Sequence, residues 1–113
     1  MLRGDIYWAN LNPTVDSEQS GTRPVLIVSR NSINNNSPVV VVIPMTKYQQ
    51  GKRIYPSHHQ LEATKSNGLK VKSVVKCEQI RAISKTRLNQ KLGTIVRADL
   101  TKIMEALKIV LDL

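Results

Sequence analysis

The stretch from Val39 to Met45 reads V-V-V-V-I-P-M and contains five consecutive β-branched residues. Such side chains favour extended backbone, and a run this short is typical of a strand rather than a helix. We therefore predict a buried strand at this position. Upstream, Asp5 to Leu11 (D-I-Y-W-A-N-L) and Pro24 to Ser29 (P-V-L-I-V-S) show the same enrichment and predict two further strands.

The chain on the other side of this stretch is also rich in strand patterns. Ser73 to Ile83 (S-V-V-K-C-E-Q-I-R-A-I) predicts a strand, and Ile54 to Leu61 alternates more weakly. Asn67-Gly68 predicts a turn within Lys65 to Lys70, and the polar segment Asn31 to Ser37 predicts a turn with some helical character.

The C-terminal segment changes from strand to helix periodicity. Asp99 is a candidate N-cap, and apolar residues then recur at the spacing of an amphipathic helix, at Leu100, Ile103, Met104, Leu107, Val110 and Leu111. With no repeat or linker, we expect one domain over residues 1–113. The predicted fold class is mainly β: five or six strands in a small antiparallel barrel, with a C-terminal helix packed on it.

The segment from Asn12 to Thr22 (N-P-T-V-D-S-E-Q-S-G-T) carries no strand or helix pattern. Asn-Pro near its start and Ser-Gly near its end are typical of a loop. Connections of this length are usually functional or mobile, so this loop is either a candidate part of a site or a mobile segment.

Charge indicates the kind of partner. Seventeen Lys and Arg residues against eight Asp and Glu give a net charge of +9, which favours nucleic acid as a ligand. No apolar run is long enough to span a membrane, and no signal peptide is evident. Cys77 is the only cysteine, which fits a reducing compartment and excludes a cysteine-rich zinc site. We expect a cytoplasmic protein.

Four segments, in order, resemble the MazF/PemK (Kid) family of toxins from type II toxin–antitoxin systems. They are Arg3 to Pro13 (R-G-D-I-Y-W-A-N-L-N-P), Glu18 to Ser29 (E-Q-S-G-T-R-P-V-L-I-V-S), Ile43 to Thr46 (I-P-M-T) and Val74 to Arg81 (V-V-K-C-E-Q-I-R). The terminal helix also falls where the family has one, so the similarity covers essentially the whole chain.

This resemblance implies an SH3-like barrel that forms a homodimer and cleaves single-stranded RNA, mRNA above all, at short sequence motifs. The implied reaction needs no metal and no cofactor: the 2′-hydroxyl attacks the neighbouring phosphorus and leaves a 2′,3′-cyclic phosphate and a 5′-hydroxyl end. Such toxins inhibit translation and growth. They are held inactive by a cognate antitoxin with an acidic, disordered tail.

The resemblance points to Arg23 and Thr46 as catalytic residues. Arginine suits the stabilisation of a charged phosphorus centre, because its planar fork donates to two oxygens and stays protonated. Arg23 precedes Pro24, which favours extended backbone, and we expect it where the loop meets a strand. Thr46 is expected just beyond the end of the Val39–Met45 strand, where its hydroxyl could position a phosphate oxygen.

A second group of residues has supporting or RNA-binding roles in this interpretation: Glu18, Gln19, Lys76, Glu78 and Gln79. The family's loop around Glu18 covers the site, and the strand with Glu78 and Gln79 lines it. Glu78 could accept a proton or hold Arg23 in place. The alternative is an ordinary surface ion pair with Lys76 or Arg81.

The chain departs from the PemK branch at two positions. Ser17 stands where that branch has a histidine before the loop glutamate, and Lys76 stands where it has an arginine. Both changes shift the expected catalytic weight to Arg23 and Thr46. Adjacent residues on a strand point to opposite faces, so His58 and His59 are not expected to share a site. Cys77 is expected in the core rather than as a nucleophile.

Two other functions remain open at this point. A non-catalytic nucleic-acid-binding barrel fits the charge equally well, although the chain has few aromatic residues for stacking. A CcdB-like gyrase poison would share the fold, but those proteins end in a helix with a C-terminal tryptophan. The only tryptophan here is Trp8, which could instead stack on bases or pack in the core or at a dimer interface.

Overall fold

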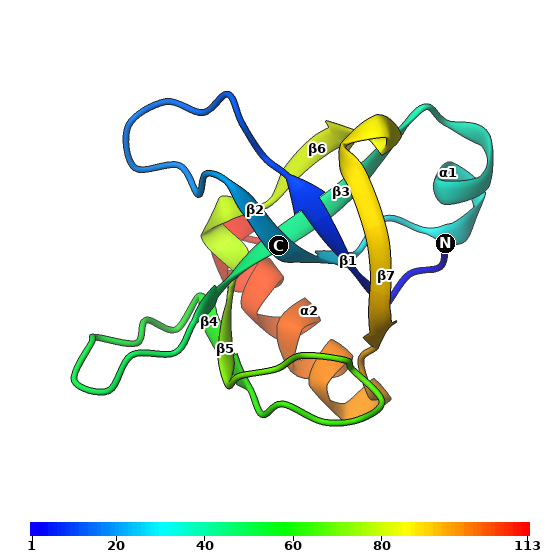
Figure 1. Ribbon diagram of the computed structural model, residues 1–113. Coiled ribbons are helices and arrows are strands. Elements are labelled where there is room, and N and C mark those ends of the chain that lie inside the picture. The colour runs from blue at the N-terminus through cyan, green and yellow to red at the C-terminus, as the bar shows by residue number, and fades with distance from the viewer.

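A computed structural model describes all residues, 1–113. Its strands form one antiparallel sheet in the order β4-β5-β3-β2-β1-β7, with β6 also paired to β3. The elements are β1 Asp5–Asn10, β2 Thr22–Ile27, α1 Asn31–Asn36, β3 Val39–Lys47, β4 His58–Leu61, β5 Ser73–Lys76, the 3-10 turn η1 Cys77–Gln79, β6 Arg81–Ser84, the 3-10 turn η2 Lys85–Arg87, β7 Leu88–Thr94 and α2 Arg97–Leu111. The sheet curls into a small barrel with α2 on its outside (Figure 1), which confirms the predicted fold class.

Strand β3 lies at the centre of the sheet and has apolar neighbours on both faces. Val40 and Val42 pack in one buried cluster, whereas Ile43 and Met45 pack in the other. Successive side chains of a strand point to opposite faces, so a strand buried on both sides needs an unbroken apolar sequence. This explains the continuous β-branched run that the sequence shows here.

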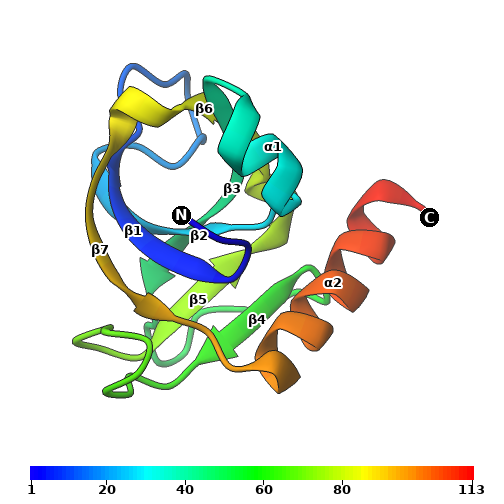
Figure 2. The same ribbon diagram turned by 90° about the vertical axis from the view of Figure 1, so that its right-hand side faces the viewer.

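Helix α2 covers one of these clusters. Its buried residues Ile103, Ala106 and Leu107 join the cluster that contains Leu61 and Cys77, and the helix runs beside β4 (Figure 2). The helix begins earlier than predicted, at Arg97. Asp99 is therefore not its N-cap. The N-cap is Val96, and the Asp99 carboxylate instead contacts His59. Neither helix has the length and apolar character needed to cross a bilayer.

The prediction of one strand from Ser73 to Ile83 is wrong. The segment divides into β5, η1 and β6, because β5 pairs with the Met45–Lys47 end of β3 and β6 pairs with the Val39–Val42 end. The turn η1 carries the chain from one part of β3 to the other. Consequently Glu78 and Gln79 lie on a turn rather than on a strand.

Three other elements also differ from the elements that the sequence predicts. In the predicted strand Ile54–Leu61, only His58–Leu61 pairs, and the preceding residues form a loop that contains Pro56. The polar turn predicted at Asn31–Ser37, with some helical character, is the short helix α1, so the helical part of that prediction is confirmed. Strand β7 was not predicted at all, since its sequence L-N-Q-K-L-G-T is mostly polar and none of its residues is fully buried.

The turn around Asn67-Gly68 is where the sequence predicts it, and it presses closely on the end of β7. Gly68 has φ +70°, and a Cβ atom there would lie 1.9 Å from the carbonyl oxygen of Leu92. In the same way, a Cβ atom on Gly93 would lie 2.3 Å from the carbonyl oxygen of Ser66. Both obstacles are backbone atoms, so this contact requires glycine on each side.

Candidate active site

A cavity of about 560 Å³ lies beside the loops that connect β1 to β2 and β3 to β4. Figure 1 shows both loops projecting from the same side of the barrel. The cavity is lined by residues from four strands and these loops: Gln19, Arg23, Thr46, Lys47, Gln49, Lys52, Arg53, Ile54, Tyr55, His58, Val74 and Lys76.

Arg23 and Thr46 both line this cavity, although 22 sequence positions separate them. Their proximity follows from the register of β2 and β3, in which Val25 lies opposite Pro44. Continuing that register by two residues puts Arg23 opposite Thr46, on one face of the sheet. Arg23 lies where the loop meets a strand, as predicted, whereas Thr46 is not at the strand end expected for it. Arg23 is the second residue of β2, and Thr46 is inside β3, where it pairs with Val74.

The side chain of Arg23 is fixed by its own loop. Its Nε donates a hydrogen bond of 2.6 Å to the carbonyl oxygen of Ser20. None of the ion pairs in the structure involves Arg23. The terminal guanidinium nitrogens are therefore available to an anion in the cavity. In particular, Glu78 does not hold Arg23, contrary to one of the roles expected for it.

The cavity is strongly cationic. Arg23, Lys47, Lys52, Arg53 and Lys76 contribute five positive side chains, and no Asp or Glu is among the lining residues. Like charges gathered on one concave surface raise the local concentration of anions and favour a ligand with several negative groups. A nucleic-acid strand, with one phosphate for each nucleotide, has this property.

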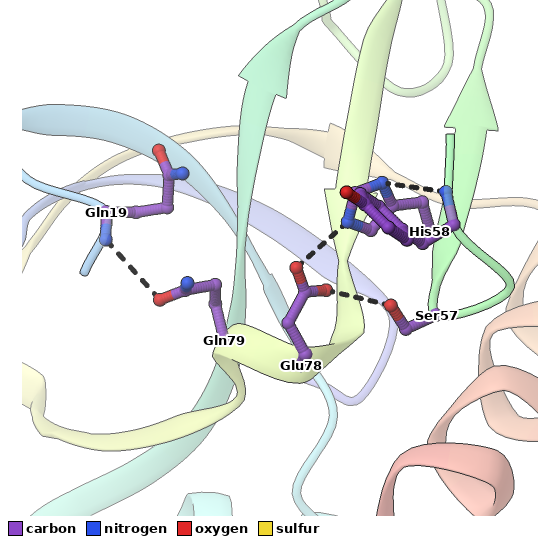
Figure 3. A network of polar contacts seen from close by, with 6 residues as sticks. Gln19, Ser57, His58, Glu78 and Gln79 are labelled. Atoms are coloured by element: carbon purple, nitrogen blue, oxygen red, sulfur yellow. Dashed lines mark hydrogen bonds and ion pairs between the residues drawn. The ribbon is translucent and has the colours of Figure 1, made fainter. Parts of the chain in front are cut away.

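Glu78 belongs to a small polar network next to the cavity, shown in Figure 3. His58 Nε2 lies 2.9 Å from one carboxylate oxygen of Glu78, and the Ser57 hydroxyl donates to the other oxygen at 3.2 Å. Glu78 pairs with neither Lys76 nor Arg81, so the predicted surface ion pair has a different partner.

This network keeps Glu78 ionised. Burial by itself raises the pKa of the Glu78 carboxyl group, but the hydrogen bond from His58 and the other donors outweigh burial, and the pKa is lowered. The ring of His58 is the more buried partner, since only 6% of its side chain is exposed. His58 also lines the cavity, so it links the carboxylate to the site.

The loop residues have separate positions. Gln19 lines the cavity, and its backbone N–H donates to the Gln79 side-chain oxygen at 3.4 Å (Figure 3). Glu18 does not line the cavity. Its carboxylate accepts a 2.6 Å hydrogen bond from the Val15 N–H and stabilises a turn within the loop. The structure thus brings Gln19 and Lys76 to the cavity with Arg23 and Thr46, and leaves Glu18 outside.

Two expectations about titratable side chains are confirmed. His59 points away from His58 and contacts Asp99 on α2 at 2.9 Å, so the two histidines have different partners. Cys77 is fully buried in the core under α2. Burial, together with the nearby charge of Glu78, raises the pKa of the Cys77 thiol to about 11. A thiol in this state is a poor nucleophile.

A second cavity, of about 230 Å³, shares part of its wall with the first. Arg23, Thr46 and Lys47 line both cavities, and Trp8 and Leu92 are among the residues that line only the second. An extended ligand that contacts Arg23 and Thr46 would therefore meet a cationic cavity and a more apolar one.

Sequence reasoning missed Lys47, Lys52, Arg53, Tyr55 and His58 as lining residues. The signal that could have found most of them is the density of basic residues in T-K-Y-Q-Q-G-K-R, which covers the end of the strand that carries Thr46 and the loop after it. Loops that follow a rigid strand commonly carry binding residues.

Comparison with known proteins identifies the family. A sequence model described as "PemK-like, MazF-like toxin of type II toxin-antitoxin system" matches residues 2–111. The chain is 40% identical to Endoribonuclease EndoA of Bacillus subtilis (strain 168) over 111 residues, which cover 98% of this chain and 94% of that protein.

Solved structures agree with this match. An endoribonuclease from a mycobacterial species, in complex with its cognate antitoxin, superposes with a TM-score of 0.80 at 28% identity over 100% of this chain and 96% of that one. MazF from Deinococcus radiodurans has the same fold, with a TM-score of 0.85 at 24% identity over 100% and 97% of the two chains. The chain therefore belongs to the family of PemK-like, MazF-like toxins of type II toxin–antitoxin systems.

Proposed function

We propose that this protein is an endoribonuclease toxin that cleaves single-stranded RNA at short sequence motifs, without a metal ion, and thereby inhibits translation. The observation that carries the proposal is the placement of Arg23 and Thr46 on one wall of a cavity with four further cationic side chains. The similarity to proteins named endoribonucleases, over nearly the full chain, supports the same reaction class.

In the proposed reaction the 2′-oxygen of one nucleotide attacks the adjacent phosphorus and loses its proton. The bond from phosphorus to the 5′-oxygen breaks, and that oxygen takes up a proton. The products are a 2′,3′-cyclic phosphate and a 5′-hydroxyl end. Negative charge grows on the non-bridging oxygens in the transition state, and the free guanidinium nitrogens of Arg23 stabilise it there.

Thr46 has a positioning role in this scheme. Thr46 lies on β3, next to the strand β2 that carries Arg23, and its hydroxyl can donate to a phosphate oxygen. The two neighbouring strands would then hold the same phosphate. The charge on the phosphate is met by the side chains of Arg23, Lys47, Lys52, Arg53 and Lys76. No group of three or more His, Cys, Asp or Glu side chains that could hold a metal ion is present.

The test is cleavage of a long, unstructured RNA in excess EDTA, with the product ends mapped by sequencing and examined for 5′-hydroxyl groups. We expect discrete cuts by the native protein. Arg23→Ala and Thr46→Val should lose most of the rate, and removal of one transition-state donor costs about 2.7–4 kcal/mol, or roughly 100- to 1000-fold. Arg30→Ala is the matched control, since Arg30 is exposed and lines neither cavity.

Each other outcome of this experiment contradicts part of the proposal. Cleavage that EDTA abolishes would refute the metal-independent reaction. RNA that is bound but left intact would indicate a non-catalytic RNA-binding barrel. Intact RNA with no binding, together with loss of gyrase supercoiling activity, would indicate a gyrase poison. Cleavage of an RNA with 2′-deoxyribose at the cut position would exclude the 2′-oxygen as nucleophile.

We further propose two partners: a second copy of the chain, in a homodimer, and a cognate antitoxin with an acidic tail. The cationic cavity supports the second proposal, because an acidic segment could occupy the place of the RNA phosphates. Light scattering should give twice the mass of the chain. Titration with the antitoxin should abolish RNA cleavage, and unchanged cleavage with saturating antitoxin would refute this role.

A further inference from the structure

One aromatic side chain lies exposed at the cationic cavity. Tyr55 lines the cavity from the loop between β3 and β4, and 48% of the residue is exposed. It is the only aromatic among the large hydrophobic residues that are exposed. The other three aromatic residues of the chain are Tyr7, Trp8 and Tyr48. All three are partly buried, and none of them lines this cavity. The position of Tyr55 is thus not accounted for by packing in the core.

The backbone of Tyr55 is held firmly despite its position in a loop. Its carbonyl oxygen accepts a 2.9 Å hydrogen bond from the N–H of His58, and its own N–H points at His58 Nδ1 at 3.5 Å. His58 is in turn fixed through Glu78 and Ser57, the network drawn in Figure 3. The backbone that carries the ring is therefore linked by hydrogen bonds to this network.

The ring of Tyr55 has two neighbours that leave part of it open. The imidazole of His58 meets it edge to face, with 5.3 Å between ring centroids and 81° between planes. The guanidinium carbon of Arg53 lies 5.0 Å from the ring centroid. An aromatic ring with a guanidinium over it offers one ligand both a flat surface, where the ring is left open, and a nearby positive charge.

A nucleotide in a single strand matches this combination. Its base has an aromatic face that can stack on tyrosine, and its phosphate can pair with arginine. In a duplex the same face is covered by neighbouring base pairs. A peptide carboxylate would satisfy Arg53 but would leave the tyrosine ring without a partner.

We propose that Tyr55 is a stacking platform for one unpaired nucleobase of the RNA, next to the phosphate that Arg23 and Thr46 act on, and that Arg53 pairs with the phosphate of the stacked nucleotide. This inference rests on the proposed ribonuclease function. It adds a binding contact that is separate from the reacting atoms, so Tyr55 is a positioning residue. Its loss should weaken substrate binding more than the chemical step.

The test measures binding to an oligonucleotide that contains the mapped cleavage motif, with 2′-deoxyribose at the cut position so that it remains intact. Tyr55→Ala should weaken its affinity roughly 5- to 150-fold, the range for loss of one base–aromatic stack. Tyr55→Phe keeps the ring and should bind like the native protein. Tyr48→Ala is the matched control, because Tyr48 also has a cation over its ring, Lys72 at 4.2 Å, but lines neither cavity.

A second series replaces the bases of the oligonucleotide with abasic sites, one at a time. One abasic position should weaken binding to the native protein and have no effect on binding to Tyr55→Ala, because the stacking partner is already missing. Native-like affinity of Tyr55→Ala, or an abasic penalty that persists in that variant at every position, would overturn the inference. In either case cleavage by the native protein would leave the ribonuclease proposal intact, whereas absence of cleavage and of binding would refute that proposal instead.

Discussion

The close contact between Gly68 and β7 makes a substitution at this glycine an informative test of the fold. We expect Gly68→Ala to destabilise the protein strongly. The new Cβ atom would stand 1.9 Å from the Leu92 carbonyl oxygen, whereas Cβ contacts below 3.0 Å essentially do not occur. The turn must therefore withdraw from β7 by at least 1.1 Å, the difference between these two distances.

The energetic cost has three parts. Alanine at φ +70° costs about 1–2 kcal/mol, because its Cβ crowds the backbone in the left-handed region. Overpacking of the contact adds about 1–3 kcal/mol. The withdrawal would also break the 2.9 Å hydrogen bond from the Thr94 N–H to the Ser66 carbonyl oxygen, for about 0.5–1.5 kcal/mol. The expected loss in the free energy of unfolding is the sum, about 2.5–6.5 kcal/mol.

Gly51→Ala is the matched control. Gly51 has φ +85° but no atom within 4 Å of its Cβ position, so only the backbone cost of about 1–2 kcal/mol applies. Urea unfolding followed by the fluorescence of Trp8, the only tryptophan, measures both variants. If the two variants lose the same free energy of unfolding, the turn does not press on β7 and this reasoning is wrong.

Three further predictions concern charge and reactivity. Because the folded pKa of Glu78 is lowered below its ordinary value of 4.5, ionised Glu78 stabilises the fold above that pH, and this contribution is lost as the pH falls through the folded pKa. Glu78→Gln should therefore destabilise the protein at neutral pH. The urea midpoints of the native protein and the variant should converge as the pH falls into the acid range. A difference between the two midpoints that does not change with pH would contradict this prediction. Cys77 should resist iodoacetamide near neutral pH in the native protein and react on unfolding in urea, and equal rates by mass spectrometry would refute its burial. The affinity for the intact oligonucleotide should fall with salt, and Lys52→Ala should reduce the log–log slope by roughly 0.7 if Lys52 contacts a phosphate.

The sequence predicts most of the fold because the periodic patterns are strong. The β-branched run in β3 and the apolar spacing of α2 depend on which faces are buried, and both are visible residue by residue. The break at η1 cannot be predicted this way, since Ser73 to Ile83 has strand character throughout. Its division depends on pairing with two different parts of β3. Strand β7 escapes prediction because its exposed residues are polar.

The residues of the candidate site likewise include some that the sequence could predict and some that it could not. Arg23 and Thr46 could be selected from the resemblance to known toxins, and the register of β2 and β3 explains why they face one cavity. Tyr55 could not be selected, because the strand predicted at Ile54–Leu61 would have placed it among ordinary sheet residues. It reaches the cavity because the chain before His58 is a loop, which depends on tertiary structure, whereas His58 lines the cavity from the first position of β4.

The adjacent histidines of β4 also have a consequence for accurate folding. His58 pairs with Glu78 on one face of the strand and His59 pairs with Asp99 on the other, and Leu61 is buried in the core. A slip of one residue along β5 would reverse every side chain of β4. One histidine would then take the place of the other and face the other's carboxylate, the second carboxylate would lose its histidine, and Leu61 would leave the core. An incorrectly paired strand would thus lose the burial of Leu61 and one of the two histidine–carboxylate contacts, so the apolar side chain does more than the paired histidines to fix the register of β4.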